Sequence, residues 1–226
     1  MRHDRWLTAG LATALVLLPA EGRAASGVGA GAGASAEERT TSDQGTGVAS
    51  PHPTLEDEQL RNGLQRLHAA NAAEIELGRL GVETASNAQV RQFAQQMVDD
   101  HGRNDQQLLA LAQAMNVPVT GKVYDAQQQE AQQARRTVQS RSGAAFDQAF
   151  MAQMVRDHEK NAREVGALAA RARGSVPELA AFLRQTEQAM KGHLSMARQV
   201  AKAAAATART SGEASTGAGS ASGTTE

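Results

Sequence analysis

One twelve-residue pattern occurs twice in the chain: FAQQMVDDHGRN at residues 93–104 and FMAQMVRDHEKN at residues 150–161. The copies lie 57 residues apart and share seven positions, which hold Phe, Gln, Met, Val, Asp, His and Asn. A match of this density is an internal repeat. In each copy the shared Phe, Met, His and Asn follow one another at spacings of four, four and three, so one face of an α-helix holds all four. The repeat predicts two amphipathic helices with His101 and His158 facing inward.

The same spacing extends over four segments of about 25 residues, and no stretch alternates apolar and polar residues as a strand does. The first helix is expected to begin after Thr54, which caps it, and the second covers residues 88–115. The third begins at Ser142 or Gly143, and the fourth covers residues 177–204. Their predicted inward faces are Leu60, Leu64, Leu67, Asn71, Glu74 and Gly78; Phe93, Met97, His101, Asn104, Leu108, Leu111 and Met115; Phe146, Phe150, Met154, His158, Asn161, Val165 and Leu168; and Leu179, Leu183, Thr186, Met190, His193, Ala197 and Val200.

Link lengths predict how these helices connect. The links at 83–87 and 173–176 are short and make two antiparallel hairpins, whereas about 27 residues join the hairpins and contain an exposed helix over 123–139. The sequence thus predicts an all-α, ferritin-like four-helix bundle with an additional helix in the crossover connection. In that topology the helices of the repeat run parallel and place His101 and His158 at one level. Reflection about the hairpin turns sets Glu74 opposite Gln96 and Met97, and His193 opposite Val155.

Both ends of the chain differ in composition from the helical part. Residues 1–24 read as a signal peptide, because Arg2 and Arg5 precede an apolar run of 13 residues and a small-residue exit after which cleavage is expected, although an uncleaved anchor stays open. Residues 25–54 and 206–226 are rich in Ala, Gly, Ser and Thr, which predicts a disordered linker and a disordered tail around a domain at 55–205. We expect export to the periplasm or secretion.

Composition narrows the classes of function. Lys and Arg number 23 against 24 Asp and Glu, and aromatic residues make up 3%, so the chain has neither a basic footprint nor stacking platforms for nucleic acid. Cys is absent, which excludes disulfides, thiolate ligands and a cysteine nucleophile. No segment after the signal is apolar enough to cross a membrane. Hydrolase and phosphate-loop motifs are missing as well.

Several short motifs resemble one known family. They are AEIELGRL at 73–80, ASN at 85–87 with VRQFA at 90–94, both Met-Val-x-Asp-His segments, and Phe146-Asp147. Over about residues 60–200 the chain resembles the exported bacterial family known as domain of unknown function 4142. The resemblance implies an export signal, a ferritin-like bundle and an envelope location. A related exported family of similar bundles includes members implicated in copper handling through Met and His.

The inward residues can be tested against the ligand requirements of two kinds of metal site. A di-metal carboxylate enzyme requires Glu three residues before the bundle histidines, but those positions hold Val98, Val155 and Met190. Met and His at helical spacing suit copper(I) when thiolates are absent. The sequence therefore predicts copper as the possible cofactor, with ligands drawn from His101, His158, His193, Met97, Met154, Met190 and Glu74.

A simpler interpretation stays open beside the metal site. Methionines at core spacing commonly fill space, and an inward His usually exchanges a hydrogen bond with a polar neighbour. Candidate neighbours are Asn71, Asn104, Asn161, Asp100 and Asp157. Such a polar layer can set helix register. The sequence favours a non-enzymatic binding or stress-protective role in the cell envelope, and the rival is an interaction module that uses the exposed helix 123–139 to bind an envelope protein or another copy of the chain.

Overall fold

The computed structural model describes residues 57–217, which form five α-helices and no strand. The helices are α1 (Glu58–Thr84), α2 (Ala88–Ala114), α3 (Lys122–Gln139), α4 (Gly143–Ala172) and α5 (Pro177–Gly217). The predicted all-α class is confirmed. The predicted signal peptide at 1–24, the linker at 25–54 and the last nine residues of the tail lie outside the described residues. None of the described helices is long and apolar enough to span a membrane.

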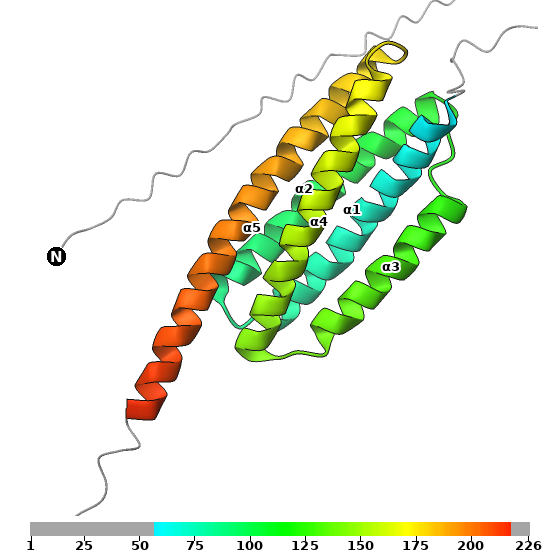
Figure 1. Cartoon of the computed structure of the whole chain (residues 1–226). Helices are drawn as coiled ribbons and strands as arrows, with labels where there is room; N and C mark the ends of the chain where they lie inside the picture. The colour runs from blue at the N-terminus through cyan, green and yellow to red at the C-terminus, as the bar shows by residue number, and fades with distance from the viewer. Residues whose placement is uncertain (1–56, 218–226) are drawn as a thin grey trace, which may run out of the picture. The chain divides into compact units, whose positions relative to one another are not determined.

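Four helices make the bundle and the fifth flanks it. α1 pairs with α2 and α4 pairs with α5, while α1 also contacts α4 and α2 contacts α5 (Figure 1). α2 and α4, which carry the two copies of the repeat, run in the same direction, as expected (Figure 1). The crossover helix α3 lies against α1 and α4. Of its side chains only Val138 is buried, which agrees with the predicted exposed helix.

Local signals explain where the helices begin and end. The side chain of Asn87 caps α2 by accepting hydrogen bonds from the backbone N–H groups of Gln89 and Val90. Asp57 caps α1 in the same way, so the predicted cap at Thr54 is wrong; the helix starts later because the Asp57 carboxylate supplies the stronger cap. At the other end α5 continues to Gly217 instead of ending near Ala204, so the helix includes residues 206–217 of the predicted disordered tail.

The core consists of two hydrophobic clusters separated by a polar layer. On each bundle helix, one cluster contributes residues before the buried polar positions and the other contributes residues after them. Phe93, Phe146 and Phe150 are at most 2% exposed, and burial of one such side chain contributes about 1.5–3 kcal/mol to stability. The buried polar residues between the clusters are Asn71, Glu74, His101, His158 and His193.

A buried carboxylate ties the α1–α2 turn to α4. Asp147 accepts hydrogen bonds from the backbone N–H of Ser86 at 3.0 Å, from the backbone N–H of Asn87 at 2.9 Å, and from the Ser86 hydroxyl. These donors precede α2, where N–H groups lack partners within the helix. The contact gives a structural role to Asp147 and to Ser86-Asn87. In the sequence these residues stand out only as motifs that resemble those of a known family.

Candidate metal centre

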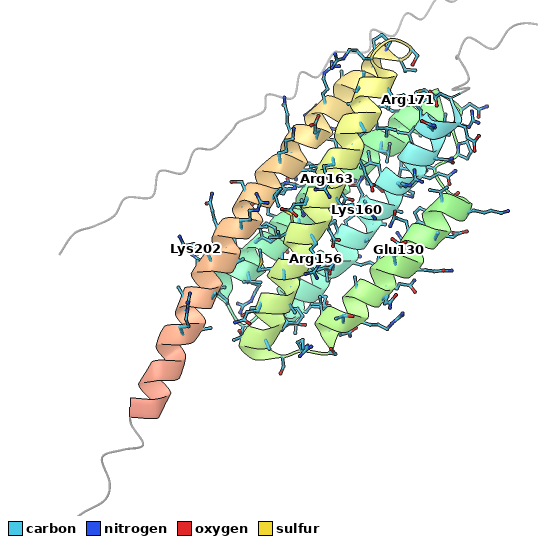
Figure 2. The ribbon with its side chains drawn as sticks, viewed as in Figure 1. Glu130, Arg156, Lys160, Arg163, Arg171 and Lys202 are labelled. Carbon is cyan, nitrogen blue, oxygen red and sulfur yellow. The ribbon has the colours of Figure 1, made fainter. Side chains whose placement is uncertain are left out.

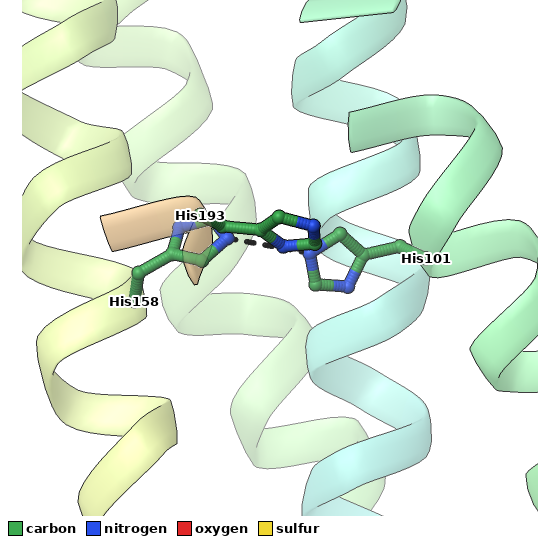
Figure 3. A group of neighbouring side chains, drawn as sticks. All are labelled: His101, His158 and His193. Carbon is green, nitrogen blue, oxygen red and sulfur yellow. Dashed lines mark hydrogen bonds between the residues drawn. The ribbon is translucent and has the colours of Figure 1, made fainter. Parts of the chain in front are cut away.

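Three histidines from three helices meet in the polar layer (Figure 3). They are His101 on α2, His158 on α4 and His193 on α5, and they are 3%, 0% and 7% exposed. Their ring centroids lie 5.5, 5.5 and 5.4 Å apart, close to an equilateral triangle. One ring nitrogen from each residue lies within 4.8 Å of the others. The rings converge on a common point from three sides.

His101 and His158 meet as their predicted common level requires, and His193 joins them. His101 and His158 lie at one level, with their Nε2 atoms 3.4 Å apart. His193 contacts both, although reflection about the α4–α5 turn placed it opposite Val155. Side chains on a helix lean toward its N terminus, so the His158 ring is displaced away from the turn and the His193 ring toward it. That lean accounts for the contact between His158 and His193, which reflection about the turn sets at different heights along the bundle.

The hydrogen bonds of His101 leave its Nε2 without a proton. Its Nδ1 lies 3.0 Å from Oδ1 of Asn71. The amide nitrogen of Asn71 is already directed at Oδ1 of Asn104 (3.0 Å) and Oδ1 of Asp105 (3.3 Å), and a carboxylate only accepts. Asn71 therefore offers its oxygen to His101, which donates from Nδ1 and keeps a lone pair on Nε2.

His158 has the same tautomer for a different reason. Its Nδ1 lies 2.9 Å from the backbone oxygen of Met154, one turn earlier on α4. Because a carbonyl oxygen can only accept, Nδ1 carries the proton and Nε2 carries a lone pair. In the neutral rings, two lone pairs thus face each other across 3.4 Å.

His193 presents its other nitrogen to the centre. Its Nε2 lies 3.0 Å from Oδ2 of Asp100 on α2, so Nε2 donates to the carboxylate. Its Nδ1 is buried without a hydrogen-bond partner among the described residues. A histidine whose second nitrogen is held by a carboxylate or a carbonyl is the usual form of a protein metal ligand. His101, His158 and His193 all meet this condition.

Burial favours the neutral imidazoles of His101 and His158. Burial lowers the pKa of His101 well below its usual value, and the neighbouring His158 and His193 lower it further. Burial lowers the pKa of His158 to about 4. The hydrogen bond from His193 lowers the pKa of Asp100 to about 2, so this carboxyl is ionised at neutral pH. The centre therefore has lone pairs available where a metal competes with few protons.

Glu74 lies beside the three histidines rather than among their converging nitrogens. It was predicted to face Gln96 and Met97 on α2, but its Oε1 is 3.7 Å from Nδ1 of His158 on α4. Glu74 is 3% exposed, and within the described residues neither carboxyl oxygen has a hydrogen-bond partner. Burial, together with the charge of Asp157, raises the pKa of Glu74 well above its usual value.

The methionines predicted as ligands lie in the hydrophobic clusters. Met97 and Met154 pack in the cluster that contains Phe93 and Phe150, and Met190 packs in the other. All three are at most 2% exposed. Each precedes one of the histidines by three or four residues, so the methionines border the polar layer. Their packing accounts for their burial, and sulfur ligation stays a prediction.

Fold and site together define a class: a helical bundle with a buried three-histidine centre. More specifically, the chain belongs to the family described as domain of unknown function (DUF4142), whose model matches residues 45–200. The predicted family is therefore confirmed, with a match that begins before the predicted Leu60. No curated protein and no solved structure matches the chain.

The sequence predicted all three histidines of the centre and two of the three groups that hold them. Asn71 and Asp100 were among the polar neighbours expected for an inward histidine, and they hold His101 and His193. The backbone oxygen of Met154 was missed, because residue type carries no information about a carbonyl acceptor. Asn161 and Asp157 were also expected as neighbours; Asp157 instead accepts hydrogen bonds from Gln153 on its own helix.

Proposed function

We propose that this protein is an exported, non-enzymatic metal-binding protein whose three-histidine centre binds a copper ion. The signal peptide predicted from the sequence supports a location in the periplasm or outside the cell. The directions and contacts of the four bundle helices support a ferritin-like arrangement, because each hairpin is antiparallel and the long crossover connects two parallel helices (Figure 1). A bundle that buries one metal centre suits sequestration or protection against free metal.

One observation carries the proposal: ring nitrogens of three histidines converge in a buried site, and the Nε2 lone pairs of His101 and His158 meet no hydrogen-bond donor among the described residues. The Nε2 atoms of His101 and His158 are 3.4 Å apart. Two nitrogens bound to one tetrahedral ion at 2.0–2.1 Å lie about 3.3 Å from each other. The spacing is therefore that of two ligands on one ion, whereas lone pairs at that distance with nothing between them repel.

Ligand chemistry favours copper among the metals that imidazole binds. Neutral imidazole suits copper, zinc, iron and nickel, and copper(II) binds such sites most tightly of the divalent ions. Three histidines without a thiolate leave the copper(I) form dependent on nearby sulfur, which Met97, Met154 or Met190 would supply after a change of rotamer. The centre also leaves a fourth position for water or a carboxylate.

Titration of the purified protein with copper(II) tests the proposal. We expect one equivalent to bind tightly, with nitrogen hyperfine structure in the electron paramagnetic resonance spectrum. Substitution of two ligands in the variant H101A/H158A is expected to weaken binding at least about 100-fold, because loss of even an outer-shell partner costs 10- to 100-fold. The matched control is His68→Ala, which removes a histidine that pairs with Asp105 outside the centre.

The result separates the metal centre from a purely structural polar layer. If copper binds no more weakly to H101A/H158A than to the wild type, the centre is not its site. If the wild type binds no copper, zinc or nickel tighter than micromolar, the histidines serve helix register alone. Circular dichroism checks that the variant remains helical.

A further inference from the structure

A groove beside the three-histidine centre leads to the surface beneath α3. It is lined by α1, α3 and α4 and has a volume of about 200 Å³. Glu74 and Asp157 belong to its lining, and Glu74 is the residue next to His158. The groove is thus a solvent-accessible region that reaches a neighbour of the centre.

Glu74 is unusual among the buried groups of the bundle. A carboxyl group that loses water and gains no hydrogen bond is costly, typically by several kcal/mol for the charged form. Glu74 is 3% exposed and both of its oxygens lack partners within residues 57–209. Glu74 also belongs to the lining of the groove, so a ligand in the groove lies against this residue. A cation would supply the missing partner.

The charges along the groove favour cations. Five carboxylates line it against three cationic side chains: Glu74, Glu76, Glu130, Asp157 and Glu164 against Arg66, Arg135 and Lys160. Two of the cations pair with Glu76 and Glu130, so acidic groups outnumber cations along the groove. Burial raises the pKa of Glu74 and the pKa of Asp157, so a cation bound by these two groups would displace protons. Two ion pairs connect α3 to the bundle across this region, Arg135 with Glu76 at 3.9 Å and Lys160 with Glu130 at 3.8 Å. Lys160 and Glu130 lie between α4 and α3 in Figure 2.

We propose that Glu74 and Asp157 form a carboxylate site for a divalent metal ion, and that the ion passes through it on the way to the three-histidine centre. The inference rests on the proposed function. Asp157, which is half-buried, meets the ion nearer the surface, and Glu74 binds it beside the His158 ring. Oxygen ligands hold a divalent transition metal less tightly than three imidazoles do, so the ion moves on to the histidines.

The structure also explains why this route passes under α3. Polar contacts hold the helix in place: Gln128 donates to the backbone oxygen of Ala69 at 2.9 Å, and Tyr124 stacks on His68. With only Val138 buried, α3 contributes little apolar burial to the fold. A helix held mainly by exposed polar contacts separates from its neighbours more readily than the core helices do.

The rate of copper uptake tests this pathway, because the rate is measured separately from the affinity of the three-histidine centre. The variant E74Q/D157N keeps the shapes of both side chains and removes the two carboxyl groups that would bind the ion. We expect its association rate with copper(II), followed by stopped-flow absorption, to fall about tenfold or more, since electrostatic steering changes such rates by 10- to 1,000-fold. The equilibrium dissociation constant should stay within about threefold of wild type, because an ion entering and leaving by one route is slowed equally in both directions.

Two further variants complete the design. Glu83→Gln is the matched control, since it removes an exposed carboxylate of α1 that is not part of the groove lining, and its rate should equal that of the wild type. Lys160→Gln removes a cation from the groove and breaks the ion pair with Glu130, so uptake should become faster. Circular dichroism verifies folding of each variant.

Each outcome has a separate meaning. Slower uptake by E74Q/D157N at unchanged affinity supports the carboxylate site. Unchanged uptake overturns it and leaves the three-histidine centre intact. A weaker affinity with an unchanged association rate makes Glu74 a ligand of the centre itself and overturns the uptake role. Absence of copper binding by the wild type overturns the proposed function and, with it, this inference. Uptake by Lys160→Gln that is no faster than wild type also overturns the route.

Discussion

Two buried carboxyl groups with equal exposure differ completely in their contacts. Asp147 and Glu74 are both 3% exposed. Asp147 accepts three hydrogen bonds from Ser86 and Asn87 at the end of the bundle. Glu74, in the central layer, accepts none from the described residues. The hydrogen bonds of Asp147 satisfy its carboxylate, whereas the unsatisfied carboxyl group of Glu74 lowers stability unless a bound ion supplies the missing partner.

The difference shows how a structural polar group is distinguished from a functional one. Burial alone does not separate them, because both positions were selected by helical packing. Hydrogen-bond satisfaction does separate them, because a buried polar atom without a partner costs free energy that an apolar residue would avoid. The same criterion divides the histidine nitrogens into three that are held by Asn71, Met154 and Asp100 and three that converge on one point.

The largest effect should follow from Asp147→Ala. Removal of the carboxylate leaves two backbone N–H groups and the Ser86 hydroxyl without their acceptor, so we expect a loss of about 4 kcal/mol in the free energy of unfolding. Urea denaturation followed by circular dichroism measures it. Asp99→Ala, which removes an exposed carboxylate of α2, is the control and should change stability by less than about 0.5 kcal/mol. A loss below about 1 kcal/mol would show that water replaces Asp147.

A smaller effect concerns pH and the histidine layer of the metal-free protein. The pKa of His158 is about 4 in the folded state, against 6.5 for an unperturbed histidine, which approximates the unfolded chain. The folded state thus binds fewer protons between these values, and stability falls as pH decreases from about 6.5 to 4. The full shift corresponds to about 3 kcal/mol. His101 changes stability in the same direction, because its pKa is also lowered.

Comparison with His158→Gln isolates this component. Glu74 has a raised pKa and acts in the opposite direction, since its folded state binds more protons and loses stability as pH rises above 4.5. Both proteins retain Glu74, so the difference between their stability profiles reports mainly on His158. With a chelator present, the wild type should lose more stability than the variant between pH 6.5 and 4. Parallel profiles would mean that His158 is accessible to solvent and protons.

The sequence predicted the inward positions well because helical periodicity depends only on spacing. Leu60, Phe93, Phe150 and Leu183 are all buried as expected. The repeat likewise predicted that His101 and His158 lie at one level, because equivalent residues on two parallel helices lie at the same height along the bundle. The contact of His193 with His158 could not be read from helix register alone, because it depends on the lean of side chains across an antiparallel pair.

Partners of polar groups were harder to predict than burial. Asp100 and Asp157 occupy equivalent positions of the repeat, yet Asp100 holds His193 and Asp157 lines the groove beneath α3. Their different roles arise from the neighbours that each helix meets: α2 packs on α5, whereas α4 also packs on α3. An internal repeat cannot show this asymmetry, because it compares the copies and not their surroundings.

The smallest and most discriminating effect is expected from Glu74→Met. Replacement of an unsatisfied buried acid by an apolar residue of similar volume should raise the free energy of unfolding of the metal-free protein by about 1 kcal/mol. The sign is opposite to that for Asp147→Ala, although the two residues are equally buried. Glu76→Met, at an exposed position on the same helix, is the control and should have little effect.

Denaturation with and without copper gives this substitution its full meaning. If Glu74 is kept for metal uptake, Glu74→Met gains stability, binds copper at equilibrium and takes it up slowly. A loss of stability comparable to that of Asp147→Ala would instead show that Glu74 has a partner in the folded protein and belongs to the structural class. Because only the sign is needed, the experiment decides between the two kinds of buried carboxyl group even if the magnitude is small.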